Sequence, residues 1–237
     1  MILASPFEII VVYMLFRKVE KMVKVFLIGA NGQVGKHIVN LLQNSDEHTL
    51  RAMVRTEQQA ETLRQSGVNA VVANLESSVN DLAKAMDGCD AVIFSAGSGG
   101  KTGLDKTLLV DLDGAVKSME AAEKAGDHRY IMVSAVQAHN RESWKDSPIK
   151  PYMAAKHYAD RMLLSSQLNY TIVRPGALLN EPSTGKIQAA EDLQRGSIPR
   201  EDVAKTVVAA LNEENTFHRS FDLMSGDQSV EEALKNI

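Results

Sequence analysis

A short apolar segment, a glycine-rich turn and a helical pattern follow one another directly near the start of this chain. The segment Lys24–Ile28 leads into Gly29, Gly32 and Gly35, three glycines at a spacing of three residues. Apolar residues then recur at helical spacing, at Val34, Ile38, Leu41 and Leu42. This pattern predicts a strand, a tight turn and a helix N-terminus, which together present free backbone N–H groups to an anion such as a pyrophosphate. A glycine-rich turn without a ligand would give the same pattern.

Strand-like and helix-like segments alternate along the rest of the chain. Apolar runs predict strands at 24–28, 50–54, 69–73, 91–95, 129–134, 170–173 and 220–224. Helical spacing predicts helices at 32–44, 58–66, 78–86, 104–125, 151–165 and 201–211. Such alternation is typical of βαβ units and of a parallel sheet that is covered on both faces. We therefore expect an α/β fold of the Rossmann type, a doubly wound parallel sheet in a three-layer α/β/α arrangement that forms a single domain.

The first 21 residues do not share this alternating pattern. The apolar run Ile9–Phe16 is too short to span a bilayer, which requires about 20 residues. Positive charge follows this run instead of preceding it, unlike the order in a secretory signal. We expect residues 1–21 to be an N-terminal appendage, an extension from an upstream start codon. Residues 22–237 would then form the domain, including a small C-terminal substrate region.

The composition excludes several classes of partner. The chain has 237 residues and a formal net charge of −4, and no basic stripe indicates a nucleic-acid surface. Its one cysteine, Cys89, allows no internal disulfide, which favours a cytoplasmic location. The six histidines lack the spacing of metal ligands. We expect a cytoplasmic protein that binds a small molecule as a monomer or homodimer, without metal, nucleic acid or membrane.

The end of the second predicted strand bears on the choice of cofactor. In dinucleotide-binding turns, an acidic residue about 20 positions after the glycines holds the ribose 2′-hydroxyl. Here Arg55 stands 20 residues after Gly35, and a guanidinium can bind a 2′-phosphate through two hydrogen bonds. This favours NADP over NAD. Two alternatives remain: Arg55 could be a solvated charge, and the nearby Glu57 could serve NAD.

Two later segments carry residues suited to proton transfer. Tyr152 and Lys156 are four residues apart and share one face of a predicted helix. An ammonium held beside a phenol favours the phenolate and lowers the pKa of the tyrosine. The tyrosine could then exchange a proton with a substrate oxygen to which Ser134, at the end of a strand, also donates a hydrogen bond. A Tyr-x-x-x-Lys spacing by itself is also a common coincidence on helix surfaces.

Taken together, these motifs resemble the short-chain dehydrogenase/reductase superfamily. From residue 22 onward the chain is most similar to its atypical NAD(P)-binding branch, the NAD-dependent epimerase/dehydratase-like or NmrA-like proteins. The resemblance rests on the glycine turn, Ser134, Tyr152 with Lys156, and the segment 173–176, Val-Arg-Pro-Gly. It implies that Tyr152 is the general acid/base, that Lys156 binds the nicotinamide ribose and lowers the pKa of Tyr152, and that Ser134 orients the substrate carbonyl.

The resemblance also implies a cofactor site and exposes two departures. The implied cofactor-binding residues are Gly29, Asn31, Gly32, Gln33, Val34, Gly35, Arg55, Ala96, Gly97, Lys156, Pro175 and Gly176. Where the family has an active-site asparagine, this chain has Asp111, which we include among the catalytic candidates although it puts the usual proton relay in doubt. The short segment 176–200 argues against a nucleotide-sugar substrate.

Two functions remain in competition. The first is an NADP(H)-dependent oxidoreductase that transfers a hydride between the nicotinamide and a small carbonyl or alcohol. The alternative is an NmrA-like protein that binds NADP(H) and reports its level to a partner without turnover. The acidic residue at position 111 and the small substrate region favour the sensor. The presence of Ser134, Tyr152 and Lys156 together favours the enzyme.

Overall fold

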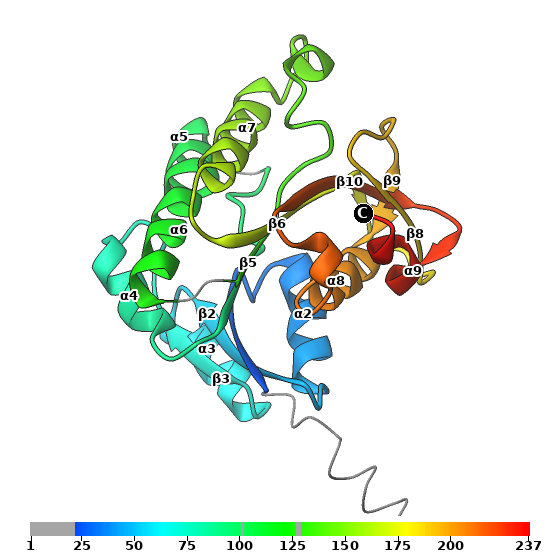
Figure 1. The fold of residues 1–237 in the computed structure, drawn as a ribbon. Helices are drawn as coiled ribbons and strands as arrows, with labels where there is room; N and C mark the ends of the chain where they lie inside the picture. Colours follow the sequence, from blue (N-terminus) through cyan, green and yellow to red (C-terminus); the bar gives the residue numbers. More distant parts are fainter. Residues whose placement is uncertain (1–21, 101, 127–128) are drawn as a thin grey trace, which may run out of the picture.

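A nine-stranded sheet forms the centre of the molecule, in the order β11-β8-β10-β6-β5-β4-β1-β2-β3 (Figure 1). The computed structural model describes residues 22–100, 102–126 and 129–237, so the expectation for residues 1–21 lies outside the described residues. The strands are β1 (Val23–Ile28), β2 (His48–Val54), β3 (Asn69–Val72), β4 (Ala91–Phe94), β5 (Arg129–Val133), β6 (Asn169–Pro175), β8 (Lys186–Ala190), β10 (Arg219–Ser225) and β11 (Gln228–Ser229).

Neighbouring strands from β3 to β10 run parallel, whereas β8 pairs antiparallel with both β10 and β11. The strand order reverses between β1 and β4, the switch point beyond which ligands bind in doubly wound sheets. The expectation of a single-domain, doubly wound α/β fold of the Rossmann type is therefore confirmed.

Helices cover both faces of the sheet. One face carries α2 (Gln33–Gln43), α3 (Glu57–Gln65), α8 (Arg200–Ala209) and α9 (Val230–Lys235). The other face carries α4 (Val79–Met86), α6 (Asp113–Ala125) and α7 (Lys150–Leu164). Short 3₁₀-helices span Arg141–Trp144 and Glu214–Thr216. The two layers can be followed in Figure 1, with α2 and α8 on one side of the sheet and α4, α6 and α7 on the other.

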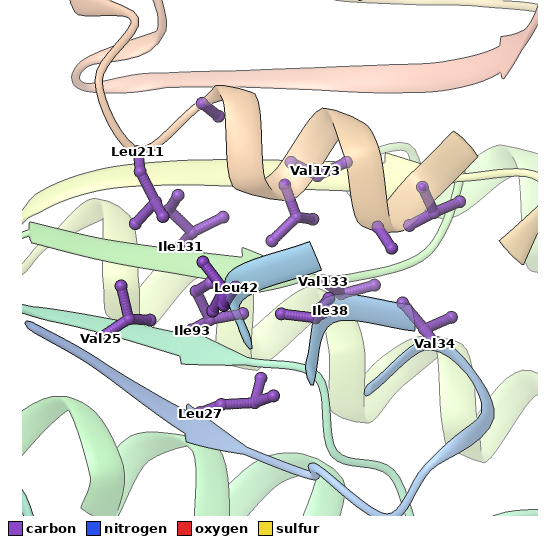
Figure 2. Close-up of a cluster of buried hydrophobic side chains, with 14 of the residues drawn as sticks. Val25, Leu27, Val34, Ile38, Leu42, Ile93, Ile131, Val133, Val173 and Leu211 are labelled. Atoms are coloured by element: carbon purple, nitrogen blue, oxygen red, sulfur yellow. The ribbon is translucent and has the colours of Figure 1, made fainter. Parts of the chain in front are cut away.

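Alternation along the strands builds a separate core on each face. In β1, Val25 and Leu27 point to the α2 side, whereas Phe26 and Ile28 point to the α6 side. Figure 2 shows Ile38 and Leu42 of α2 among the strand residues on the α2 side. Fully burying each such side chain stabilises the fold by about 1.5–3 kcal/mol. These cores hold the carboxyl ends of the parallel strands rigidly at one edge.

The predicted helix at 104–125 is wrong in one respect, because the structure divides it into three parts. A short α5 (Leu104–Lys106) leads into a π-helix, η1 (Thr107–Leu112), and then into α6. A π-helix closes i→i+5 hydrogen bonds and accommodates one more residue than an α-helical turn. Apolar spacing cannot reveal it, since the flanking helical pattern continues.

Five elements near the C-terminus were not expected from the sequence. They are β8, β11, α9 and the two strands of a small parallel sheet, β7 (Ala177–Leu179) and β9 (Ser197–Pro199). The strands are short and only Ile187, Ile198 and Pro199 among their apolar residues are buried, so they lack the apolar runs that predict strands. The start of α9 did carry a signal, because Ser229 and Glu232 form a capping box.

Candidate functional site at the carboxyl edge of the sheet

Backbone crowding requires glycine at the turn between β1 and α2. Gly29 has φ of +91°, and a Cβ there would lie 2.7 Å from Ala96 N and from Ser95 O. A Cβ on Gly35 would collide with Gly29 O, and one on Gly32 would lie 3.1 Å from the same oxygen. Because the obstacles are backbone atoms, they cannot move aside as a side chain would. The turn therefore brings the start of α2 against the end of β4.

The N-terminus of α2 has features that suit an anion. Gly32 is the N-cap, no side chain caps the helix, and its first turn contains no acidic residue. The first N–H groups of a helix lack partners within the helix, and they lie at the positive end of its dipole. Gln33 is exposed at this position, whereas the side chain of Val34 is buried in the core. Val34 can therefore contact a ligand only through its backbone N–H.

A cavity of about 390 Å³ opens beside this helix start. Its walls are the glycine turn, the ends of β2 and β4, and the segment after β3. Of the residues expected to bind cofactor, it is lined by Gly29, Asn31, Gly32, Arg55, Ala96 and Gly97. The glycine cradle, the uncapped helix and the cationic Arg55 all fit the phosphate-bearing adenosine half of a dinucleotide. Ser134, Tyr152, Lys156, Pro175 and Gly176 are not part of this lining.

The cavity also has lining residues that sequence reasoning missed. Lys106 of α5 forms an ion pair with Glu76, with Nζ 2.7 Å from Oε1, and both residues line the cavity. Gln59 accepts a hydrogen bond from Arg55 N at 3.1 Å. The remaining lining residues include Asn74, Ser98 and Thr102. Their position after strand ends was the available signal, because ligands in such sheets bind beyond those ends.

Lys156 is buried at the same edge of the sheet. Its Nζ donates a hydrogen bond to Val133 O at 3.0 Å and lies 5.8 Å from the centroid of the Phe94 ring. Tyr152, one helical turn earlier, is partly buried. The hydroxyl of Ser134 is buried and has no hydrogen-bond partner among the described residues. Leaving a buried hydroxyl unpaired is costly, which fits a group that pairs with a bound ligand.

The expected lowering of the Tyr152 pKa is wrong for this arrangement. Burial raises the pKa of the phenol, and the nearby carboxylates of Asp111 and Asp160 raise it further. Burial lowers the pKa of Lys156, while Asp111 and Asp160 oppose that change. The sequence motif shows the lysine near the tyrosine, but it does not show the two carboxylates. Tyr152 is consequently a neutral phenol at neutral pH and a potential proton donor.

Asp111 reaches this edge from the π-helix η1. It is 1% exposed, and its Oδ2 accepts a hydrogen bond from Ser98 N at 3.0 Å. Its Oδ1 has no partner among the described residues, and a Cβ on Gly97 would lie 3.1 Å from it. The π-helix thus directs a carboxylate to the loop after β4. The structure brings Asp111 into electrostatic range of Tyr152 and Lys156.

The segment after β6 is held mainly by packing. Pro175 and Gly176 are buried, and a Cβ on Gly176 would collide with Gly196 O and with the sulfur of Met224. Gly176 is therefore required for close packing whether or not a ligand binds. The preceding residue, Arg174, forms a buried ion pair with Asp160 of α7.

Gln137 is a further residue near this edge that the sequence did not indicate. It is buried and has φ of +60°, which is uncommon for a residue other than glycine. Its amide donates hydrogen bonds to Asp192 and to Asp222 Oδ2, and its backbone N–H donates to Asp222 Oδ1 at 3.2 Å. It thereby joins the loop after β5 to the C-terminal region. No spacing pattern predicts such a contact.

Across residues 22–100, 102–126 and 129–237, no three His, Cys, Asp or Glu side chains are grouped so that they could hold a metal ion. Within the same ranges, every helix is too short or too polar to cross a bilayer.

Comparisons with known proteins agree with this geometry. A family model described as NAD(P)H-binding matches residues 29–214. The chain is 60% identical over 214 residues to the uncharacterized sugar epimerase YhfK of Bacillus subtilis, covering 90% of this chain and 100% of that protein. The structure of the oxidoreductase ylbE from Lactococcus lactis matches with a TM-score of 0.81 and 33% identity, covering 90% of this chain and 96% of that chain.

A third match comes from Bacillus halodurans. This structure, whose description assigns it to the NAD-dependent epimerases/dehydratases, has a TM-score of 0.84 and 40% identity, covering 91% of this chain and all of that one. The match to the family model spans more than half of the chain, and YhfK is matched over its whole length. The chain therefore belongs to the NAD(P)H-binding family, among whose relatives are proteins named as oxidoreductases and as epimerases.

Proposed function

We propose that this protein is an NADP(H)-dependent oxidoreductase that acts on a small carbonyl or alcohol. The observation that carries the proposal is the hydroxyl of Ser134, which is buried without a hydrogen-bond partner among the described residues, at the sheet edge where Lys156 is also buried. A polar group left in this state favours a ligand oxygen at that position. When bound, the nicotinamide would accept or supply the hydride.

In this proposal the glycine turn and the cavity beside it hold the cofactor. The N–H groups at the start of α2 bind the pyrophosphate, with Asn31 and Gln33 at the mouth of the turn. Ala96 and Gly97 line the path along the end of β4, while Pro175 and Gly176 close the nicotinamide side. Arg55 binds the 2′-phosphate, and this contact gives the preference for NADP over NAD.

The roles in proton transfer follow from the electrostatics of the site. Ser134 donates a hydrogen bond to the substrate oxygen, and Tyr152 donates the proton that the reduced oxygen requires. Lys156 orients the cofactor ribose, and its ammonium favours the phenolate left after proton transfer. Burial and the carboxylates of Asp111 and Asp160 raise the pKa of Tyr152, so the phenol carries the proton that carbonyl reduction requires. Asp111 supports the charge of Lys156 from the π-helix.

The relative YhfK is named as a sugar epimerase, and an epimerase of this kind would show no net oxidation of its cofactor. A sensor of the NmrA-like kind would bind cofactor without any turnover. The small C-terminal substrate region that we propose favours a small carbonyl over a nucleotide sugar. These three functions therefore differ in what happens to NADPH.

The test combines cofactor binding with turnover. Calorimetric titration with NADPH and NADH in parallel should show tighter binding of NADPH, and Arg55→Ala should remove that preference. NADPH consumption with a panel of small aldehydes and ketones should then be abolished in Tyr152→Phe, while its NADPH affinity stays within a few-fold of the parent protein. Unchanged turnover in Tyr152→Phe would contradict the mechanism. Binding without turnover in the parent protein would favour the sensor.

A further inference from the structure

A buried ion pair joins α7, the helix that carries Tyr152 and Lys156, to β6. Arg174, near the end of β6, donates from Nε to Asp160 Oδ2 of α7 at 2.7 Å. The side chains are 3% and 2% exposed. Arg174 also donates from Nη1 to Ser220 Oγ of β10 at 3.3 Å. The pair therefore joins α7 to two neighbouring strands.

Asp160 shares a helix face with the two residues that the proposed chemistry uses. Tyr152, Lys156 and Asp160 follow one another at intervals of four residues along α7, so they form one row on the side that meets the sheet. Lys156 donates one of its three N–H groups to Val133 O. Asp160 Oδ1 is buried and has no hydrogen-bond partner among the described residues. One carboxylate oxygen is thus held by Arg174, and the other accepts no hydrogen bond from the described residues.

Such an arrangement is a poor source of stability. Removing two charges from water is costly, and a buried pair is often no more stable than apolar residues that fill the same space. An unpaired carboxylate oxygen adds to that cost. The Asp160 carboxylate also lies one helical turn from the buried ammonium of Lys156. At that position its negative charge can favour the protonated lysine.

We propose that Asp160, oriented by Arg174, is a positioning residue that keeps Lys156 charged beneath Tyr152. The inference rests on the proposed function, because it concerns the same site. Burial alone would favour the neutral amine of Lys156. The negative charge of Asp160 opposes this effect of burial, and Asp160 does so without touching the substrate or the reacting atoms. Arg174 holds Asp160 Oδ2 in place, whereas Asp160 Oδ1 accepts no hydrogen bond from the described residues.

Several charged groups face Lys156 from the surrounding elements. Asp111 contributes from the π-helix η1, and Asp160 contributes from α7 itself; both raise the pKa of Lys156 against the effect of burial. Tyr152 lies one turn away on α7, and Arg174 of β6 forms the ion pair with Asp160. Asp111 and Asp160 are the two groups that favour the ammonium. Loss of Asp160 should therefore move the titration of Lys156 toward lower pH without abolishing it.

The test measures the protonation of Lys156 directly. Lysine labelled with ¹³C and ¹⁵N is followed by NMR through a pH titration of the full chain, and the Lys156 signal is assigned by its absence in Lys156→Met. Asp160→Asn should shift the titration midpoint down by about one pH unit or more, and Asp160→Glu should largely restore it. Asp202→Asn is the matched control, since it also removes a fully buried carboxylate but lies at the start of α8. Its Lys156 midpoint should not move.

Turnover adds a second readout. With a carbonyl that the parent protein reduces, the alkaline limb of the pH–rate profile should move to lower pH in Asp160→Asn, with little change in NADPH affinity. Equal Lys156 midpoints in Asp160→Asn and the parent protein would overturn the proposal. If Asp160→Asn does not fold, titration of the parent protein still tests the proposal, because a neutral Lys156 at pH 7 would also overturn it. The NMR result needs no substrate, so absence of any NADPH turnover would count against the proposed function alone.

Discussion

Replacing Gly29 by alanine tests how strictly the turn between β1 and α2 depends on its backbone. The new Cβ would meet two difficulties at once. It would sit on a residue with φ of +91°, and it would lie 2.7 Å from backbone atoms of Ser95 and Ala96 at the end of β4. A left-handed conformation costs a residue with a Cβ about 1–2 kcal/mol. Forcing an additional carbon into a closely packed region costs about 1–3 kcal/mol more.

The two effects add to about 2–5 kcal/mol of lost stability in Gly29→Ala. In a chain of this size each kcal/mol lowers the melting temperature by about 2–4 °C, so the expected fall is about 4–20 °C. Gly126→Ala separates the two effects, because Gly126 has φ of +82° and its hypothetical Cβ would meet no atom of the described, non-adjacent residues within 4 Å. It should lose only the conformational part, about 1–2 kcal/mol.

The assay is thermal unfolding of the parent protein and both variants, followed by titration with NADPH. Gly29→Ala should unfold at a lower temperature than Gly126→Ala and should bind NADPH at least about tenfold more weakly, the loss expected for about 1.4 kcal/mol. Gly126→Ala should bind as the parent protein does, because Gly126 is the C-cap of α6 and does not line the cavity. Equal melting temperatures for the two variants, or unchanged NADPH affinity in Gly29→Ala, would refute the reasoning.

Three other expectations can be measured with the same methods. Burial raises the pKa of Asp202, but hydrogen bonds from Ser183, Thr184 and Gly185 outweigh it and hold that pKa below the usual value. Its ionised form therefore stabilises the fold above about pH 4, and this contribution is lost as the pH falls through the lowered value. Denaturant unfolding from pH 3 to 7 should show a weaker pH dependence in Asp202→Asn, and an identical slope would contradict this. Ser229→Ala should lower stability by about 1 kcal/mol through loss of its helix cap, and no change in melting temperature would contradict that role. Glu76→Gln should tighten NADPH binding by a few-fold at low salt, because it removes negative charge from the cavity wall, whereas unchanged affinity would place the pair outside the binding path.

The sequence predicted the alternating core well because each central strand is a continuous apolar run. Val25–Ile28 and Ala91–Phe94 are buried along their whole length, so these strands could be predicted from their apolar runs without tertiary information. The short strands after Gly176 were not, because their pairing depends on contacts with β10 and on each other. For these elements the decisive interactions are distant in sequence.

In the candidate site too, local features were predicted from the sequence and features that depend on distant residues were not. The glycine turn was predicted from local spacing alone, since its geometry arises from residues that adjoin in sequence. The electrostatics of Tyr152 were predicted with the wrong sign, because its environment includes Asp111 from another helix and Asp160 two turns along its own helix. Lys106 and Glu76 were missed because each is an ordinary surface charge until the fold brings them 2.7 Å apart.

The π-helix at Thr107–Leu112 has a consequence for changes in chain length. A π-helical turn accommodates one residue more than an α-helical turn, so it is geometrically equivalent to an α-helix with one residue inserted. Deleting one residue there would restore continuous α-helical bonding while leaving the register of Asp113–Ala125 unchanged. The deletion would rotate the residue at the position of Asp111 by about 100°, the angle between successive residues of an α-helix. A length change of one codon is thus enough to add or remove a carboxylate at this site, independently of any substitution in the strands or in the glycine turn.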